Sequence, residues 1–159
     1  MVPIIAYNLG ARNKKRILDT IKVALITSTS FLTFVMILFQ IFPAQVFSLF
    51  EASEDMLAMG IPALRIITLH FIMAGFGVIA GSIFQALGNG MLSLFASAIR
   101  QLAVLLPSAY LLSLTGNVNN VWWSFVIAEL ACVIFCGWCM KKLYKTVIKP
   151  LDEPLPEKE

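Results

Sequence analysis

Apolar residues dominate four long stretches of the chain, and polar residues gather between them. The stretches cover residues 23–42, 66–87, 91–114 and 121–140. A helix rises about 1.5 Å per residue, so about 20 apolar residues cross the roughly 30 Å of hydrocarbon in a bilayer. The pattern therefore predicts an all-α fold, a polytopic membrane bundle of four transmembrane helices.

The same pattern divides the chain into three regions. Residues 1–22 are expected to form a cytoplasmic stub and basic loop, residues 23–149 the transmembrane domain, and residues 150–159 a disordered cytoplasmic tail that contains Pro154 and Pro156. The chain is 59% hydrophobic and 13% charged, whereas soluble domains are about 25% charged. The excess apolar surface is expected to face lipid.

The segment before the second stretch has the form of a helix start. Ser53 precedes Glu54 and Asp55, which matches an N-cap followed by acids in the first turn. The helix is therefore predicted to begin well before the membrane. Pro62 is predicted to kink it near the interface.

Charged residues indicate how the bundle is oriented. Basic residues flank the four stretches at both ends: Arg12, Lys14, Lys15, Arg16 and Lys22 before the first, and Lys141, Lys142, Lys145 and Lys149 after the last. The loop between the first two stretches carries Glu51, Glu54 and Asp55 instead. Because short cytoplasmic loops are rich in Lys and Arg, both termini are predicted to lie on the cytoplasmic side of the plasma (inner) membrane. Basic residues beside apolar runs favour anionic lipid over nucleic acid as a partner.

No motif indicates an enzyme, a cofactor or a metal. The sequence lacks a carboxylate dyad, a phosphate-binding loop and a histidine cluster. Cys132, Cys136 and Cys139 share one helical face within an apolar run, and buried cysteines usually behave as small hydrophobic residues. We expect them to be reduced and to bind no metal.

Two ionisable residues fall near the middle of predicted spans. Arg100 lies in the third span and Glu129 in the fourth. These helices run antiparallel, and the helical rise places both side chains at depths that differ by about 4 Å. The sequence therefore predicts a buried ion pair. Two hypotheses stay open for it: a structural lock between helices, or part of a substrate or ion pathway.

A stripe of small and polar residues follows one face of the second span. It consists of His70, Ala74, Gly77, Gly81, Gln85 and Gly88. Gly77 and Gly81 allow another helix to approach closely, which favours a packing face. The alternative is a cavity wall with His70 and Gln85 as polar groups. On the third span, Pro107 is expected to take part in packing and Gln101 is a further candidate for the pathway.

Several short segments occur in the order typical of one transporter family. They are Pro3-Ile4-Ile5-Ala6-Tyr7-Asn8-Leu9-Gly10-Ala11-Arg12-Asn13, Phe84-Gln85-Ala86-Leu87-Gly88, Arg100-Gln101 with Pro107, and Trp123-Ser124-Phe125 with Ala128-Glu129. Together they resemble the carboxy-terminal end of multidrug and toxic compound extrusion (MATE) transporters. The resemblance implies the last four of twelve helices, and a parent protein that exports drug-like organic cations in exchange for Na⁺ or H⁺.

The resemblance also implies partners that this sequence does not contain. Family members are about three times as long, so the amino-terminal lobe and the seventh helix are expected to be missing, and the chain to be a fragment, a truncated reading frame or one piece of a split transporter. One branch of the family has an acidic coupling residue on its tenth helix, where this sequence has Ile72, Met73 and Ala74. Two alternatives remain: a self-sufficient four-helix homodimeric multidrug transporter, and a non-transporting membrane subunit or scaffold.

Overall fold

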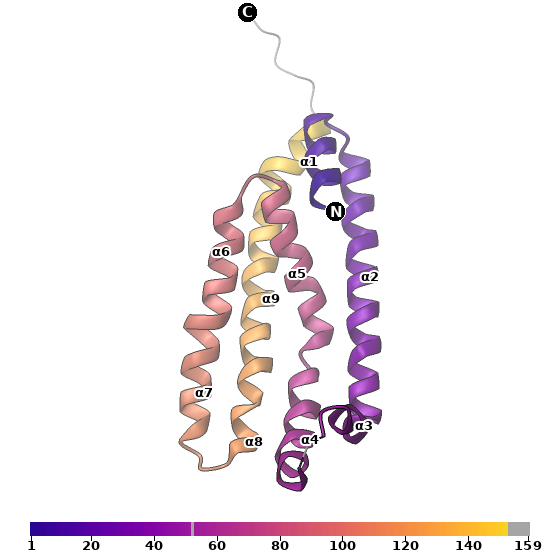
Figure 1. Ribbon diagram of the computed structural model, residues 1–159. Helices are drawn as coiled ribbons and strands as arrows, with labels where there is room; N and C mark the ends of the chain where they lie inside the picture. Colours follow the sequence, from indigo (N-terminus) through magenta and orange to yellow (C-terminus); the bar gives the residue numbers. More distant parts are fainter. Residues whose placement is uncertain (52, 153–159) are drawn as a thin grey trace, which may run out of the picture.

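The computed structural model describes residues 1–51 and 53–152, and within them all regular secondary structure is helical (Figure 1). Pro154 and Pro156 of the predicted tail lie outside the described residues. The elements are α1 (Val2–Gly10), α2 (Lys14–Ile41), α3 (Pro43–Ser48), α4 (Glu54–Thr68), α5 (Phe71–Ala86), α6 (Gly90–Ala98), the π-helical segment η1 (Ile99–Leu105), α7 (Leu106–Ser113), α8 (Val118–Val121), α9 (Trp123–Leu143), the π-helical segment η2 (Tyr144–Ile148) and the 3₁₀ segment η3 (Lys149–Asp152).

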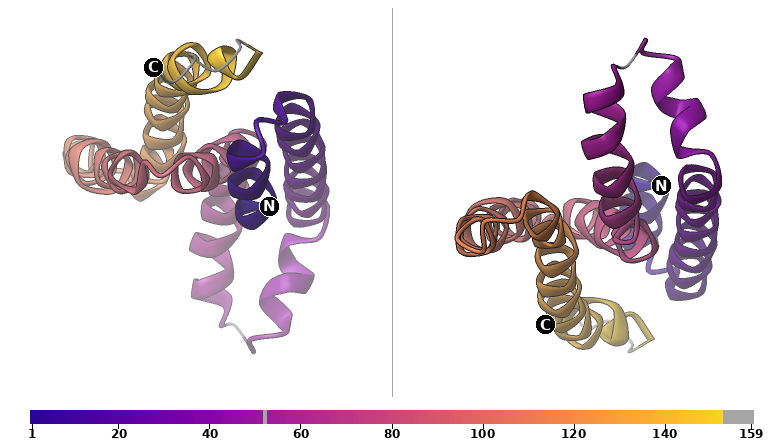
Figure 2. Two further views of the ribbon diagram at one scale, coloured as in Figure 1. Left: turned by 90° about the horizontal axis from the view of Figure 1, so that it is seen from above. Right: turned by 90° about the horizontal axis from the view of Figure 1, so that it is seen from below.

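The predicted all-α membrane fold is confirmed. Three helical stretches are long and apolar enough to cross a membrane, Lys14–Ile41, Gly90–Ser113 and Val118–Asp152. The pair formed by α4 and α5 passes the same test as one bent span, which makes four. Along the bundle axis, α7, α5 and α2 form a row, with α9 on one side and α3 and α4 on the other (Figure 2).

The predicted basic loop is largely helical. Asn13 caps α2 by accepting a hydrogen bond from the Arg16 backbone N–H, 3.1 Å away. The helix therefore begins at Lys14, well before the apolar run. Ile17 and Ile21 explain why the early turns are stable, because both are buried. The predicted stub is also ordered: it forms α1, packed against α2 and α5 with Ile5 fully buried.

The second span bends at a different place from the predicted one. Ser53 caps α4 as expected, but the helix continues through Pro62, and the 54° bend falls between Thr68 and Phe71. The Leu69 and His70 amides bond to the carbonyls three residues earlier, those of Ile66 and Ile67. This tightening leaves the Arg65 carbonyl without its usual donor four residues later.

A glutamine from α2 compensates for the broken helix. Gln40 Nε2 donates to the Arg65 carbonyl at 2.7 Å and to Thr68 Oγ1 at 3.1 Å. Thr68 Oγ1 in turn donates to the Leu64 carbonyl at 2.8 Å. An unsatisfied backbone group is costly in an apolar environment, so these bonds stabilise the bend.

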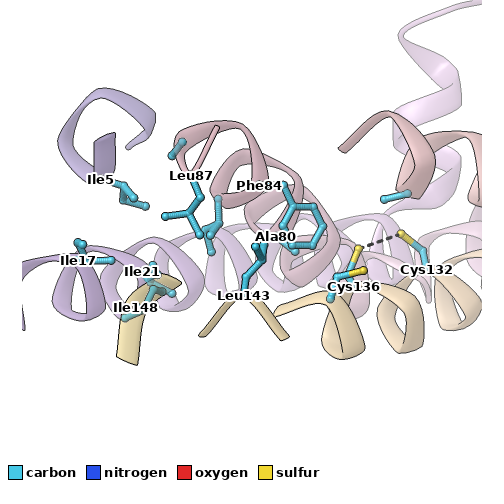
Figure 3. Packing of buried hydrophobic residues seen from close by; sticks show 14 residues of the cluster. Ile5, Ile17, Ile21, Ala80, Phe84, Leu87, Cys132, Cys136, Leu143 and Ile148 are labelled. Atoms are coloured by element: carbon cyan, nitrogen blue, oxygen red, sulfur yellow. Dashed lines mark hydrogen bonds between the residues drawn. The ribbon is translucent and has the colours of Figure 1, made fainter. Parts of the chain in front are cut away.

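Buried apolar side chains concentrate at the end of the bundle that holds α1 and the start of α2 (Figures 1 and 3). There Ile5, Ile17, Ile21 and Ile148 meet at one edge of a cluster that continues through Phe84 to Cys132 and Cys136 (Figure 3). Elsewhere large apolar side chains remain exposed along the helices, which suits a chain whose surroundings are lipid or further protein.

Candidate functional site: a polar cavity beside a buried ion pair

The predicted ion pair between Arg100 and Glu129 is present. Arg100 Nη1 donates to Glu129 Oε2 at 3.3 Å, across the interface of η1 and α9. The Glu129 side chain is 3% exposed and the Arg100 side chain 35% exposed. The two charges therefore differ in environment: the carboxylate is enclosed, and the guanidinium reaches an opening.

The π-helical segment η1 carries Arg100, and a proline follows it. Pro107 lies in the first turn of α7 and lacks a backbone N–H, so it cannot continue the regular hydrogen bonding of the helix. Ser108 Oγ donates to the Val104 carbonyl at 2.6 Å and to the Leu105 carbonyl at 3.1 Å. The hydroxyl thus adds hydrogen bonds to two carbonyls beside the irregular turn.

Glu129 owes its position to a glycine on α5. A Cβ added at Gly77 would lie 2.8 Å from Glu129 Oε1 and 3.8 Å from Cys132 Sγ. Oε1 is buried and has no hydrogen-bond partner among the described residues. A buried carboxylate oxygen without a donor is costly, which marks this oxygen as a place where a proton or a cation would be stabilised.

A cavity of about 240 Å³ opens next to the ion pair. It lies between α5, α6, η1 and α9, and its lining is rich in glycine and serine. The residues are Gly77, Val78, Gly81, Ser82, Gln85, Ser93, Ala96, Ser97, Arg100 and Cys132. Gly77, Gly81 and Gln85 of the small-residue stripe line this cavity, whereas His70, Ala74 and Gly88 are not part of its lining.

The Gln85 end of the stripe is held by a hydrogen bond between α5 and α6. Gln85 Nε2 donates to Ser93 Oγ at 3.1 Å, across the turn at Gly88. Gly88 adopts a φ of +77°, which favours glycine. An added Cβ at Gly81 would lie 3.3 Å from Ser93 Oγ, so the glycine allows α6 to approach α5 at the cavity.

Two of the predicted site residues, His70 and Gln101, do not line this cavity. His70 is at the bend of the second span, where its ring stacks on Phe125 at 6.2 Å between centroids and meets Phe71 edge-on. Its Nδ1 also contacts the Ile67 carbonyl. Gln101 is exposed on η1 and is not part of the lining. The structure therefore brings together Arg100, Glu129 and Gln85, with Gly77 and Gly81.

The sequence predicts Cys132 to be a small hydrophobic residue of the core and does not mark it as part of a site. Cys132, Cys136 and Cys139 are buried free thiols on one face of α9, as expected. Cys132 also lines the cavity. Its position three residues after Glu129 was the available signal, because residues three apart in a helix share a face.

A protein-family model matches most of this chain. The MatE family model matches residues 1–111. The chain belongs to the MatE family. This confirms the predicted resemblance to multidrug and toxic compound extrusion transporters, a family of proteins that move solutes across membranes.

Curated MatE relatives carry the name multidrug export protein MepA. The protein from Staphylococcus haemolyticus strain JCSC1435 is 28% identical over 143 residues, which cover 90% of this chain and 31% of the relative. The protein from Staphylococcus aureus strain NCTC 8325 is 30% identical over 136 residues, or 84% of this chain and 29% of the relative. The chain thus spans about three tenths of the length of these relatives.

A solved structure shares the fold. It is described as an inward-facing conformation of a multidrug resistance MATE family transporter of the MOP superfamily. The two structures superpose with a TM-score of 0.84 at 22% identity, over 98% of this chain and 36% of that one. The arrangement of helices is therefore that of a MATE transporter.

Proposed function

We propose that this chain forms the carboxy-terminal part of an ion-coupled multidrug efflux antiporter, which exports amphipathic organic cations in exchange for Na⁺ or H⁺. The main support is the polar cavity beside a buried carboxylate in a chain of the MatE family. Membership of the family supports a solute carrier over an enzyme. Named relatives that are multidrug export proteins support the class of substrate.

The ion pair offers a way to couple an ion to movement of the helices. Glu129 attracts Arg100 through Oε2 and leaves Oε1 free of partners among the described residues. A proton or Na⁺ that engages Oε1 would neutralise the carboxylate and weaken its hold on Arg100. Because the two residues belong to α9 and η1, ion occupancy would then bias how closely these helices pack.

The cavity suits the proposed pathway by its polarity and its position. Arg100 and Gln85 lie at its wall, and Glu129 lies directly behind Gly77. An organic cation passing on this side would be attracted by the carboxylate once Arg100 has moved away. In the proposed transporter, an amino-terminal lobe supplies the opposite wall, and both termini of this chain lie in the cytoplasm.

A chimeric transporter tests this function. The chain would replace the matching part of the Staphylococcus haemolyticus relative, and efflux of ethidium from cells that lack other exporters would be measured. We expect the chimera to export ethidium and the Glu129→Gln chimera to lose at least about tenfold in rate, because one interaction of this kind is worth a few kcal/mol. Comparing Na⁺ and proton gradients in vesicles would identify the coupling ion.

Glu54→Gln provides the matched control, because Glu54 is an exposed carboxylate in the first turn of α4. This variant should export at the rate of the parent chimera. A chimera that reaches the membrane in normal amounts but leaves ethidium retention unchanged would contradict the proposal. Equal efflux by the Glu129→Gln and Glu54→Gln chimeras would remove Glu129 from the mechanism.

A further inference from the structure

The residues after α9 fold back onto the start of α2. Arg12 Nη2 donates to the Pro150 carbonyl at 3.0 Å, and Lys14 Nζ pairs with Asp152. Lys14 also lies 5.8 Å from the centre of the Tyr144 ring. These contacts bring the lysines at the end of α9 and in η2 and η3 next to α2, although the sequence predicts a disordered tail from residue 150.

The folded-back segment encloses a hollow of about 750 Å³ with a strongly basic lining. Its residues are Lys14, Lys141, Tyr144, Lys145, Lys149 and Asp152. Asp152 is already paired with Lys14. Within the described residues, Lys141, Lys145 and Lys149 have no carboxylate within 4.0 Å. Among the described residues, the hollow therefore carries an excess of positive charge that an anion would stabilise.

An apolar stripe on α9 leads directly to these lysines. Ile127, Leu130, Ile134 and Trp138 are exposed and follow one another at helical spacing. The next turn carries Lys141, Lys142 and Lys145, which with Trp138 line a second hollow of about 340 Å³. Lys142 Nζ lies 5.7 Å from the centre of the Trp138 ring. Lys141 and Lys145 line both hollows, so the basic surface is continuous.

We propose that this basic surface is a binding site for an anionic phospholipid, with the phosphodiester held by Lys141, Lys145 and Lys149. Its acyl chains lie along the stripe from Ile127 to Trp138. Basic pockets at the membrane surface favour anionic head groups, and the adjoining apolar stripe distinguishes a lipid from free phosphate. The site is at the end of α9 and does not depend on the transport activity.

Quenching of tryptophan fluorescence tests the site on the full chain. The chain would be reconstituted in vesicles of phosphatidylcholine with phosphatidylglycerol, with bromine on the acyl chains of one lipid or the other. The signal of Trp138 is the difference between the parent and Trp138→Phe, because the chain has 3 tryptophans. We expect brominated phosphatidylglycerol to quench Trp138 several times more effectively than brominated phosphatidylcholine. Equal quenching by the two lipids in the parent chain would overturn the proposal.

Charge variants identify the lysines that cause the preference for phosphatidylglycerol. Each lysine near the surface is worth about fivefold in affinity for an anionic lipid. In Lys141→Gln/Lys145→Gln the two brominated lipids should therefore quench Trp138 equally. Lys15→Gln/Arg16→Gln removes the same charge from the exposed start of α2 and should keep the preference, as should Lys141→Arg/Lys145→Arg. An equal loss in both Gln pairs would show general surface attraction and contradict a site. Displacement by millimolar inorganic phosphate would reveal an anion site and contradict the lipid.

Discussion

Glu129 and Gly77 lie against each other where α9 crosses α5. A Cβ at Gly77 would come within 2.8 Å of Glu129 Oε1, a distance that would force the carboxylate to move. The other oxygen of Glu129 accepts the hydrogen bond from Arg100. The glycine of α5 and the ion pair between α9 and η1 therefore form one structural unit.

Gly77→Ala should disturb this unit. The Glu129 carboxylate must shift to make room for the methyl group, which would weaken its hydrogen bond to Arg100. We therefore expect less folded chain in detergent and a lower temperature of unfolding. Gly137→Ala is the matched control on α9, because nothing lies within 4 Å of its added Cβ. This control should gain about 0.5 to 1 kcal/mol from better helix propensity. Similar unfolding temperatures for the two variants would contradict the proposed contact.

The pairing of Arg100 with Glu129 could be predicted from the sequence because only the helical rise and the antiparallel order of two spans were needed. The predicted contact between Arg100 and Glu129 is present, with Nη1 and Oε2 3.3 Å apart. The glycine that makes room for Glu129 could not be assigned in the same way. Helical spacing placed Gly77 on a small-residue face, but the partner of that face depends on the packing of three helices.

The ion pair should show strong and asymmetric coupling. Removing one partner of a buried pair costs about 3 to 5 kcal/mol, chiefly by leaving the other charge unpaired. Glu129 is almost fully enclosed, whereas Arg100 borders the polar cavity, where serine hydroxyls or water can replace the carboxylate. Arg100→Ala should therefore reduce the folded yield more than Glu129→Ala, and the double variant should lose less than the sum.

The exposed pair of Lys14 and Asp152 provides the comparison. The Asp152 side chain is 63% exposed, and surface pairs contribute about 1 kcal/mol or less. A double-variant cycle with Lys14→Ala and Asp152→Ala should therefore give little coupling. Additive effects at Arg100 and Glu129, similar to those of the exposed pair, would show that the two buried charges do not stabilise each other.

The bend in the second span shows where local sequence signals are insufficient. Pro62 predicts a kink at its own position, yet the helix passes through it and bends at Leu69 and His70. The decisive contact comes from Gln40 on α2, which is 25 residues from Arg65 in the sequence. A hydrogen bond between distant segments supplies what the broken helix lacks, and no local pattern encodes it.

Loss of the hydrogen bond between Gln40 and the Arg65 carbonyl should destabilise the bend. Gln40→Leu leaves the Arg65 carbonyl with only the longer bond from Thr68 Oγ1, at 3.3 Å. Thr68→Val removes the hydroxyl that bonds the Leu64 carbonyl. Each change should cost about 1 kcal/mol and speed amide hydrogen exchange in the peptide that spans residues 69–74. Thr20→Val is the control, since Thr20 bonds the Arg16 carbonyl within the regular helix α2. Unchanged exchange at residues 69–74 would contradict the role of Gln40.

The final prediction concerns the orientation of the bundle. The start of α2 and the end of α9, which carry the two basic blocks, lie at the same end, and α3 and α4 lie at the opposite end with the acidic loop (Figure 1). Because basic loops stay in the cytoplasm, a cysteine at Asn119 should react with a membrane-impermeant maleimide in intact cells, and one at Lys15 only after permeabilisation. Both positions are exposed. The three native thiols are buried, so the parent chain gives the background. Labelling of the Lys15 variant but not the Asn119 variant in intact cells would reverse the orientation, and would move the proposed lipid site to the outer leaflet.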